Sequence, residues 1–186
     1  ITDQFPEQIE WDMSMIKIYT IDIETSTEYG FPDPYTANES VLLISVQDFI
    51  TKQITTFGCK HFLNKQDNVK YVKCESETDL LSKFITFIKN DFPDVITGWN
   101  VEFFDIPYIV NRITNILGKN AANKLSPWGI LENRTIEFKG KEIETYTPAG
   151  ISVLDYYHLY KKFSFTNQES YKLDRSEEHT SELQSR

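Results

Sequence analysis

The stretch from Ile16 to Glu24, IKIYTIDIE, constrains the fold of this chain more than any other part of its sequence. Its residues alternate between two faces with a period of two, which predicts a central β-strand. Residues two apart in a strand point the same way, so Asp22 and Glu24 are expected side by side on one face, at the carboxyl end of the strand. A core strand that ends in two adjacent carboxylates needs a chemical explanation.

Other segments extend the sheet. Hydrophobic runs bounded by turn residues predict further strands at Val41–Phe49, Gln53–Cys59, Val69–Cys74, Asp94–Asn100 and Ile151–Asp155. The first three follow one another so closely that we expect them to pair antiparallel. Residues Arg134–Pro148 alternate on both sides of Lys139 and Gly140, which predicts a protruding β-hairpin.

Two segments change to a helical period. Glu77–Lys89 has an apolar face, and Ser76 is its expected cap. A second helix is expected within Phe104–Gly118, because Pro107 suits the first turn and Gly118 marks the stop. Strands in close succession, followed by alternating helices and strands, predict an α/β fold in which a mixed sheet has helices on its faces.

The composition fits one globular domain. The chain has 186 residues, 40% of them hydrophobic, which is enough to bury one sizeable core. Its net charge of −9 argues against a free-standing basic nucleic-acid binder. If the chain contacts nucleic acid, other parts would supply much of the binding. Two cysteines and no apolar run of about 20 residues predict a soluble protein without a membrane span, in the reducing environment of the cytoplasm.

Both ends of the chain predict a fragment. Ile1 is not an initiator residue, so we interpret residues 1–15 as the end of a preceding N-terminal region and residues 16–174 as the domain itself. Residues 175–186, RSEEHTSELQSR, break sharply from the aromatic-rich sequence before them. Read back into codons, they resemble a common sequencing-library adapter, with an ordinary polar tail as the alternative. We therefore set them aside in reasoning about the fold.

The acid pair at the end of the first strand indicates metal binding. Two like charges as close as Asp22 and Glu24 repel, and each raises the pKa of the other unless a cation lies between them. Mg²⁺ and Mn²⁺ prefer oxygen ligands and tolerate clustered carboxylates. The alternative is a strand that simply emerges into solvent at Thr20.

Asp105 is a third candidate ligand. It lies where a turn meets the start of a helix, so an ordinary helix cap is the alternative. It also follows a predicted strand, and open α/β sheets gather their sites at the carboxyl ends of strands. Three acids from two strand ends can then meet around a metal ion. Asp155 ends another apolar strand, and either supports the same site or caps the next helix.

Two motifs carry a resemblance to a known family. DIET, together with GWNVEFFDIPYIVNRI at 98–113, resembles the first two motifs of the 3′–5′ exonuclease domain of family B DNA polymerases. The segment Gly150–Asp174 is similar to the replicative polymerases of tailed bacteriophages. The resemblance covers Ile16–Asp174. It implies a ribonuclease-H-like fold that uses two metal ions to remove mispaired primer ends during DNA replication.

The resemblance implies roles for individual residues. Asp22, Glu24 and Asp105 would be catalytic metal ligands, with Glu24 also near the attacking water. Asn100 and Phe104 would bind nucleic acid by lining the site for the single-stranded 3′ end; a turn asparagine and a core phenylalanine are the alternatives. The implied cofactor is a pair of Mg²⁺ ions, for which Mn²⁺ can substitute.

The resemblance also implies partners and a missing part. The partners are the single-stranded 3′ end of primer DNA, the palm, fingers and thumb of the remaining polymerase chain, and a sliding clamp bound through that remainder. Arg134–Pro148 takes the place of a β-hairpin that helps separate primer from template, unless it is a solvated surface hairpin. The third family motif has three residues between a Tyr and an Asp ligand, whereas Tyr171 and Asp174 have two, so we expect the fourth carboxylate to be absent here.

Two other functions fit part of the pattern. A non-catalytic nucleic-acid-binding module would keep the fold without activity, but the intact set of Asp22, Glu24 and Asp105 argues against such decay. A glycosidase would use a carboxylate pair, yet residues two apart on one strand suit a shared metal better than opposed acid and base roles. The histidines show no zinc spacing. A metal-dependent exonuclease is therefore the favoured interpretation.

Overall fold

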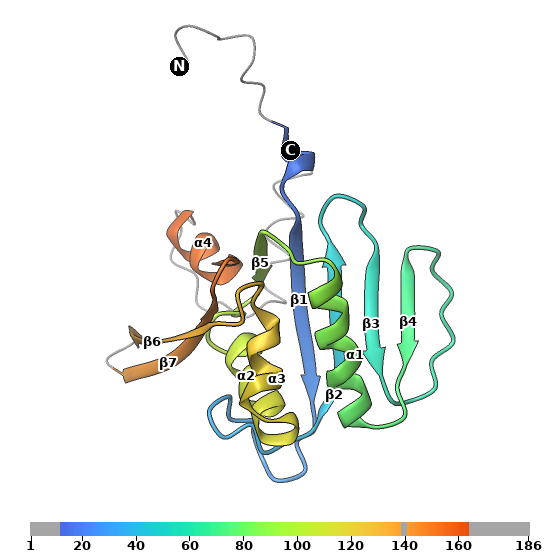
Figure 1. Ribbon diagram of the computed structural model, residues 1–186, viewed down its shortest axis with the longest axis horizontal. Coiled ribbons are helices and arrows are strands. Elements are labelled where there is room, and N and C mark those ends of the chain that lie inside the picture. Colours follow the sequence, from blue (N-terminus) through green and yellow to red (C-terminus); the bar gives the residue numbers. More distant parts are fainter. Residues whose placement is uncertain (1–11, 139–140, 164–186) are drawn as a thin grey trace, which may run out of the picture.

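A mixed β-sheet forms the centre of the molecule in the computed structural model, which describes residues 12–138 and 141–163. Within these residues the sheet has six strands in the order β4-β3-β2-β1-β5-β8, so β1 lies inside it (Figure 1). β1 pairs antiparallel with β2 and parallel with β5, and β8 continues parallel beside β5. The strands are β1 (Ile18–Thr25), β2 (Val41–Asp48), β3 (Ile54–Gly58), β4 (Val69–Lys73), β5 (Val95–Gly98) and β8 (Ser152–Asp155).

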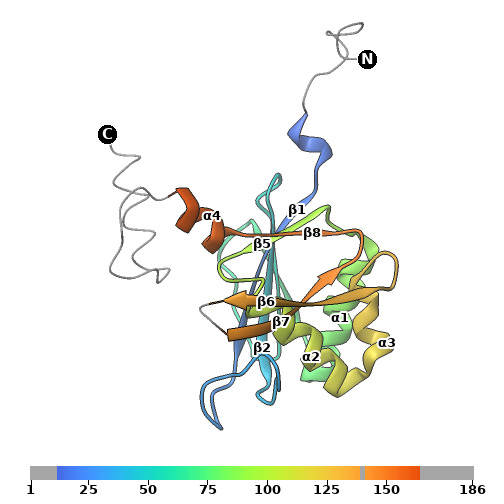
Figure 2. The same ribbon diagram turned by 90° about the vertical axis from the view of Figure 1, so that its left-hand side faces the viewer.

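Helices lie on both sides of this sheet. Figure 2 shows α1, α2 and α3 together on one face and α4 on the other side. The helices are α1 (Glu77–Asn90), α2 (Asp105–Leu117), α3 (Lys119–Ala122) and α4 (Tyr156–Phe163), with short 3-10 turns η2 (Met13–Met15) and η3 (Asn123–Leu125). Among the described helices, none has the length and apolar character to cross a membrane. The predicted mixed α/β architecture is confirmed.

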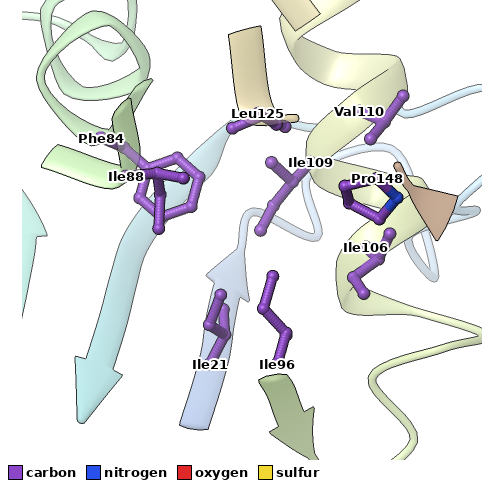
Figure 3. Close-up of a pocket in the computed structure, with 9 residues that line it drawn as sticks. All are labelled: Ile21, Phe84, Ile88, Ile96, Ile106, Ile109, Val110, Leu125 and Pro148. Atoms are coloured by element: carbon purple, nitrogen blue, oxygen red, sulfur yellow. The ribbon is translucent and has the colours of Figure 1, made fainter. Parts of the chain in front are cut away.

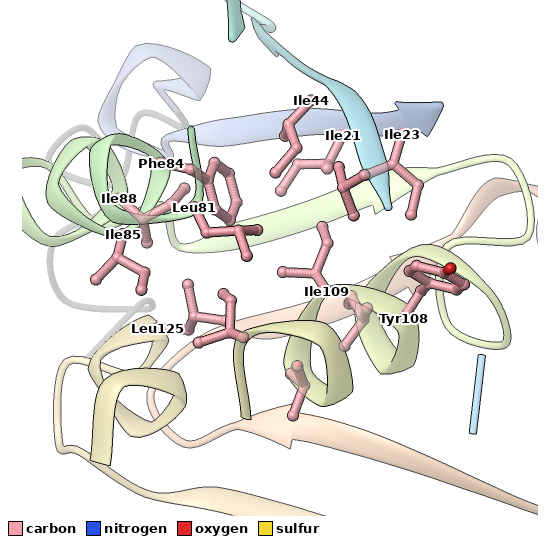
Figure 4. Close-up of a cluster of buried hydrophobic side chains, with 14 of the residues drawn as sticks. Ile21, Ile23, Ile44, Leu81, Phe84, Ile85, Ile88, Tyr108, Ile109 and Leu125 are labelled. Atoms are coloured by element: carbon pink, nitrogen blue, oxygen red, sulfur yellow. The ribbon is translucent and has the colours of Figure 1, made fainter. Parts of the chain in front are cut away.

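The core lies between the sheet and helices α1 and α2 (Figure 4). Tyr19, Ile21 and Ile23 of β1 are buried on this side, whereas Asp22 and Glu24 are exposed on the opposite face. The two-faced strand predicted from the sequence is therefore confirmed. From α1 the buried side chains are Leu80, Leu81, Phe84, Ile85 and Ile88.

A small apolar cavity lies in the core and is shown in Figure 3. Its volume is about 30 Å³. That is room for roughly one water molecule, and far below the several hundred Å³ of a typical ligand pocket. The nine lining residues are Ile21, Phe84, Ile88, Ile96, Ile106, Ile109, Val110, Leu125 and Pro148. The cavity is a packing gap in the core, on the face of β1 away from its acids.

The local signals read from the sequence are confirmed at both long helices. Ser76 is the N-cap of α1, and its side chain accepts a hydrogen bond from the Asp79 N–H at 3.2 Å. α2 ends at Gly118, whose φ of +86° lies in the region that favours glycine. All six predicted strands are present, with ends within two residues of those expected.

The direction of β4 was predicted wrongly. β4 pairs with β3 in parallel, with Ile54 opposite Val69 and Gly58 opposite Lys73. The connection through residues 59–68 runs back to the end of the sheet where β3 begins, so β4 enters from the same side as β3. Closeness in sequence favoured an antiparallel pair, but this connection is long enough to make the return without a helix.

β6 (Leu131–Phe138) and β7 (Lys141–Pro148) form a separate antiparallel pair. Figure 1 shows the pair beside α2, directed away from the main sheet. Residues 139–140 lie outside the described part of the chain, so the hairpin turn predicted there stays a prediction. The same holds for residues 1–11 and 164–186, which include the rejected third-motif residues Tyr171 and Asp174.

A half-buried ion pair fixes α2 against α1. The Arg112 Nε and Nη2 donate to the two carboxylate oxygens of Glu77, at 2.7 and 2.8 Å. The remaining guanidinium nitrogen of Arg112, Nη1, donates to the backbone carbonyls of Ala37 and Asn38. Such a two-pronged contact fixes direction as well as distance. It therefore holds α2 in place relative to α1 and to the loop that precedes β2.

Gly98 allows β5 to approach β1 closely. A Cβ atom at this position would lie 2.6 Å from the backbone oxygen of Ile21 and 3.1 Å from the Cβ of Val101. The first contact is with backbone, which cannot rotate away as a side chain could. Any larger residue at the end of β5 would therefore push the two central parallel strands apart.

We predict that Gly98→Ala destabilises the chain by about 1–3 kcal/mol, the usual cost of overpacking a core. Urea unfolding of the variant and the wild type would measure the difference in free energy. Lys89→Ala, at an exposed position of α1, is the control and should stay within about 0.5 kcal/mol of the wild type. Equal stability of Gly98→Ala and the control would contradict the close approach.

Candidate active site

The candidate site is built where two parallel strands separate. β1 and β5 pair as far as Thr20 and Thr97, and β5 then ends while β1 continues to Thr25 beside β2. Beyond that point, the edge of β1 that faced β5 has no strand partner among the described residues. The structure fills the gap with Asp105, whose Oδ1 accepts a hydrogen bond from the backbone N–H of Ile23 at 3.0 Å. The site thus lies at the carboxyl ends of β1 and β5, as expected for an open α/β sheet.

Asp105 is not an ordinary helix cap. It is the first residue of α2, and the N-cap position belongs to Phe104, whose side chain makes no capping hydrogen bond. The Asp105 carboxylate instead reaches across to β1. The cap interpretation is therefore wrong, and the acid joins two elements that are far apart in sequence.

Burial and neighbouring charge favour the protonated form of the Asp105 carboxyl group. Only 4% of the residue is exposed, and this burial raises the pKa of Asp105 to about 7, with the charge of Asp22 as the next cause. Asp155 raises the pKa of Asp105 as well, whereas the Ile23 N–H lowers it. A cation beside Asp105 would favour its charged form and reverse the shift. The site is therefore electrostatically prepared for a positive charge.

Asp22 and Glu24 lie on the face of β1 opposite the core. Much of the surface of Asp22 is exposed, yet partial desolvation of its carboxyl group raises its pKa, and the neighbouring charge of Glu24 raises it further. Within residues 12–138 and 141–163, neither side chain receives a hydrogen bond or forms an ion pair. Two adjacent acids without protein partners are what a hard divalent cation would satisfy.

The three acids interact but do not form a closed ligand set. Asp22 raises the pKa of Asp105, and Glu24 raises that of Asp22, so the electrostatic cluster is continuous. In the described part of the chain, however, no three His, Cys, Asp or Glu side chains stand close enough together to hold a metal ion. The donor chemistry fits a divalent metal, and the three predicted ligands are gathered at one end of two strands.

Glu24 is exposed and also borders an open groove. It lies on the wall of a groove of about 580 Å³ that runs along the start of β2, the residues after β3, and the start of α1. Other lining residues include Leu43, His61, Phe62 and Tyr71. A metal ion or a water molecule can therefore reach the Glu24 carboxylate through open space.

Asn100 and Phe104 lie in the loop between β5 and α2. Asn100 has a φ of +62°, which a turn asparagine tolerates well, and its backbone N–H donates to Asp155. Phe104 is partly buried against the core, and its ring lies 5.6 Å from that of Tyr108. The alternatives of a turn asparagine and a core phenylalanine both describe what is seen. Contact of either residue with nucleic acid stays a prediction.

Asp155 is buried beside the candidate site and is bonded to the loop that precedes α2. It is 4% exposed and ends β8, directly beside the end of β5. Its Oδ1 accepts from the N–H groups of Asn100 and Tyr157, at 3.0 and 2.9 Å, and its Oδ2 accepts from that of Glu102 at 3.0 Å. Asp155 therefore caps α4, as one alternative expected, and it also holds the loop before α2. Support of the site by Asp155 stays a prediction.

Comparison with known proteins identifies the family. Residues 3–175 match the family described as DNA polymerase family B, exonuclease domain. The chain belongs to this family. Exonuclease domains of the family generally depend on divalent metal ions, in agreement with the acid cluster at the ends of β1 and β5.

Two phage enzymes are among the similar proteins. The DNA-directed DNA polymerase of Escherichia phage RB69 is 36% identical over 94% of this chain, and that of Enterobacteria phage T4 is 30% identical over 96%. The DNA polymerase delta catalytic subunit of Bos taurus is 32% identical over 58% of the chain. The chain spans 22% and 23% of the lengths of the two phage proteins. It therefore corresponds to roughly one fifth of such a polymerase.

We predict that Asp105→Asn makes the stability of the metal-free chain less dependent on pH. The folded-state pKa of about 7 lies above the ordinary value of 3.8, so the folded state holds this proton more tightly than the unfolded state does. The resulting stabilisation is present at low pH and is lost as the pH rises from about 4 to about 7.

Urea unfolding in EDTA, at about pH 5 and about pH 8, would test this prediction. The wild type should lose more unfolding free energy between the two conditions than Asp105→Asn does. Asp67→Asn, at an exposed position after β3, should keep the wild-type dependence. If Asp105→Asn and the wild type lose the same amount, Asp105 does not carry the raised pKa.

Proposed function

We propose that this exonuclease domain performs 3′–5′ proofreading in a DNA-directed DNA polymerase. The reaction would be hydrolysis of the terminal phosphodiester of a mispaired primer strand during DNA replication. The observation that supports it most is the hydrogen bond that holds Asp105 against β1, the strand that carries Asp22 and Glu24, in a chain of the exonuclease family. The substrate would be the single-stranded 3′ end of primer DNA.

We also propose a ribonuclease-H-like fold. The supporting feature is the order β3-β2-β1-β5-β8, in which β2 is antiparallel to its neighbours while β1, β5 and β8 run parallel. Helices lie on both sides of that arrangement. The β6–β7 pair would be the hairpin that helps to separate primer from template, placed beside α2 and the loop that precedes it.

In the proposed mechanism, the chain's own acids hold two Mg²⁺ ions, which Mn²⁺ can replace. Asp22 and Glu24 would be shared ligands, because they project from one face of β1 without protein partners in the described chain. Asp105 would be the third ligand and would become charged on binding. When bound, such ions activate a water molecule and stabilise the leaving 3′ oxygen. Glu24, accessible from the open groove, would orient that water.

The loop before α2 would receive the 3′ end of the primer. Asn100 and Phe104 are both partly exposed, and Phe104 directly precedes Asp105 at the start of α2. A partly exposed aromatic ring can stack on a nucleic-acid base. Replacing such a ring with alanine weakens binding by about 1–3 kcal/mol per base. The palm, fingers and thumb, nucleotide addition and a sliding clamp would belong to the remaining polymerase chain.

We predict that replacing both Asp22 and Glu24 with Ala in the intact polymerase abolishes Mg²⁺-dependent excision and spares nucleotide addition. The reason is that the two shared ligands are lost, while the polymerase site lies in other domains. Excision of a labelled, mispaired primer and extension of a matched primer would be measured on the same preparation. Glu28→Ala, an exposed acid in the loop after β1, is the control and should excise normally. Undiminished excision by the double variant would refute the proposal.

We further predict that the acids bind metal in the absence of DNA. Calorimetric titration of the intact polymerase with Mn²⁺ should lose a binding event in the variant Asp22→Asn with Glu24→Gln. These substitutions keep the shape of both side chains and remove their charge. Identical titrations would instead favour a non-catalytic nucleic-acid-binding module that holds no metal at this place.

A further inference from the structure

The buried carboxylate of Asp155 is fully engaged by backbone. Its two oxygens receive three N–H donors, from Asn100, Glu102 and Tyr157, at distances of 2.9 to 3.0 Å. Two of these donors belong to the loop between β5 and α2, and the third belongs to the first turn of α4. Hydrogen bonds to a charged acceptor are about twice as strong as neutral ones. Asp155 is therefore a clamp on that loop.

The same bonds distinguish Asp155 from the candidate metal ligands. Asp22 and Glu24 have no hydrogen-bond partner among the described residues, so their oxygens are open to a cation. Both oxygens of Asp155 are occupied, and 4% of the residue is exposed. Its arrangement suits a role in holding protein groups in place better than one in coordination.

The clamped loop leads directly to Asp105. Asn100 is held at a φ of +62°, a conformation that side chains other than glycine adopt at some cost. Val101, between the two clamped N–H groups, is fully buried, and its carbonyl accepts from the Ile106 N–H at 3.0 Å, within the first turn of α2. The position of the loop therefore sets where α2 begins.

The loop is also held from its far side by β7. The Thr145 hydroxyl donates to the backbone carbonyl of Glu102, so the peptide groups on both sides of Glu102 are fixed. Thr145 has no exposed surface. A loop fixed by buried groups from β7 and β8 can hold a reactive carboxylate to within a fraction of an ångström.

We propose that Asp155 is a positioning residue for the exonuclease site: its carboxylate holds the Asn100–Glu102 loop and so places Asp105 at the end of β1. This inference rests on the proposed function. It assigns Asp155 a role through the loop, separate from its capping of α4. The two roles can be separated, because a serine at an N-cap still accepts a hydrogen bond from the helix but is too short to hold the loop as well.

The test compares Asp155→Ser with Asp155→Ala in the intact polymerase. Asp155→Ser keeps an acceptor for the Tyr157 N–H and loses the bonds to Asn100 and Glu102. Asp155→Ala loses all three. We expect both variants to lower Mg²⁺-dependent excision by about tenfold or more, as do losses of groups that orient metal ligands, with normal nucleotide addition. The concentration of Mn²⁺ that gives half-maximal excision should rise in both.

Asp94→Ser is the matched control. The Asp94 carboxylate also accepts a backbone N–H, that of Lys17 at 2.8 Å, but at the opposite end of the sheet from the acids. Its loss should leave excision and the Mn²⁺ requirement unchanged. Wild-type excision by Asp155→Ser, with a loss confined to Asp155→Ala, would show that only the capping of α4 matters and would overturn the proposal.

Hydrogen exchange gives a readout that does not depend on activity. In Asp155→Ser, a peptide covering residues 99–104 should exchange faster than in the wild type, while one covering 156–160 should be unchanged. Unchanged exchange at 99–104 would overturn the role of Asp155 in holding the loop.

The double variant Asp22→Ala, Glu24→Ala separates the role of Asp155 from the proposed function. If this variant still excises, the proposed function fails, whereas the exchange result still reports on whether Asp155 holds the loop.

Discussion

The hydrogen bond between the Ile23 N–H and Asp105 is the contact on which the candidate site depends. β1 leaves β5 after Thr20, and a buried N–H without a partner would cost about 1–3 kcal/mol. A carboxylate oxygen satisfies that donor, so the acid has a structural reason to lie beside β1 before any metal arrives. The same placement desolvates Asp105 and brings it near Asp22, which raises its pKa. The Asp105 carboxylate therefore satisfies a backbone N–H of β1 and is also a candidate metal ligand.

The rest of the fold limits how far that side chain can move. Arg112, two turns further along α2, is joined to Glu77 of α1 by two hydrogen bonds, and the loop before α2 is held from β7 and β8. Gly98 lets β5 run close beside β1 up to the point where the loop begins. The helix that carries Asp105 is thus fixed in its middle and at its start. Asp22 and Glu24 differ from Asp105 in that they lie on the face of β1 opposite the core and are exposed to solvent.

The sequence predicted the parts of this arrangement that are local. A period of two placed Asp22 and Glu24 on one face, and Gly118 marked the end of α2. The direction of β4 was wrong because it depends on the path of residues 59–68, which carries no periodic signal. Asp105 could not be told from a helix cap, since both put an acid at a helix start. The bonds of Asp155 to residues 53 and 55 positions earlier have no local signature at all.

The parallel strand β4 has a consequence for assembly. It is the last strand on its side of the described sheet, and a bare edge invites another strand to pair with it. Lys70 and Lys73 of β4 are exposed. A neighbouring strand that paired with β4 would have to remove water from these charged side chains, which opposes pairing. The charges of these two lysines therefore protect the β4 edge of the described sheet from further strand pairing. Two copies of this domain are therefore expected to resist pairing through their β4 edges.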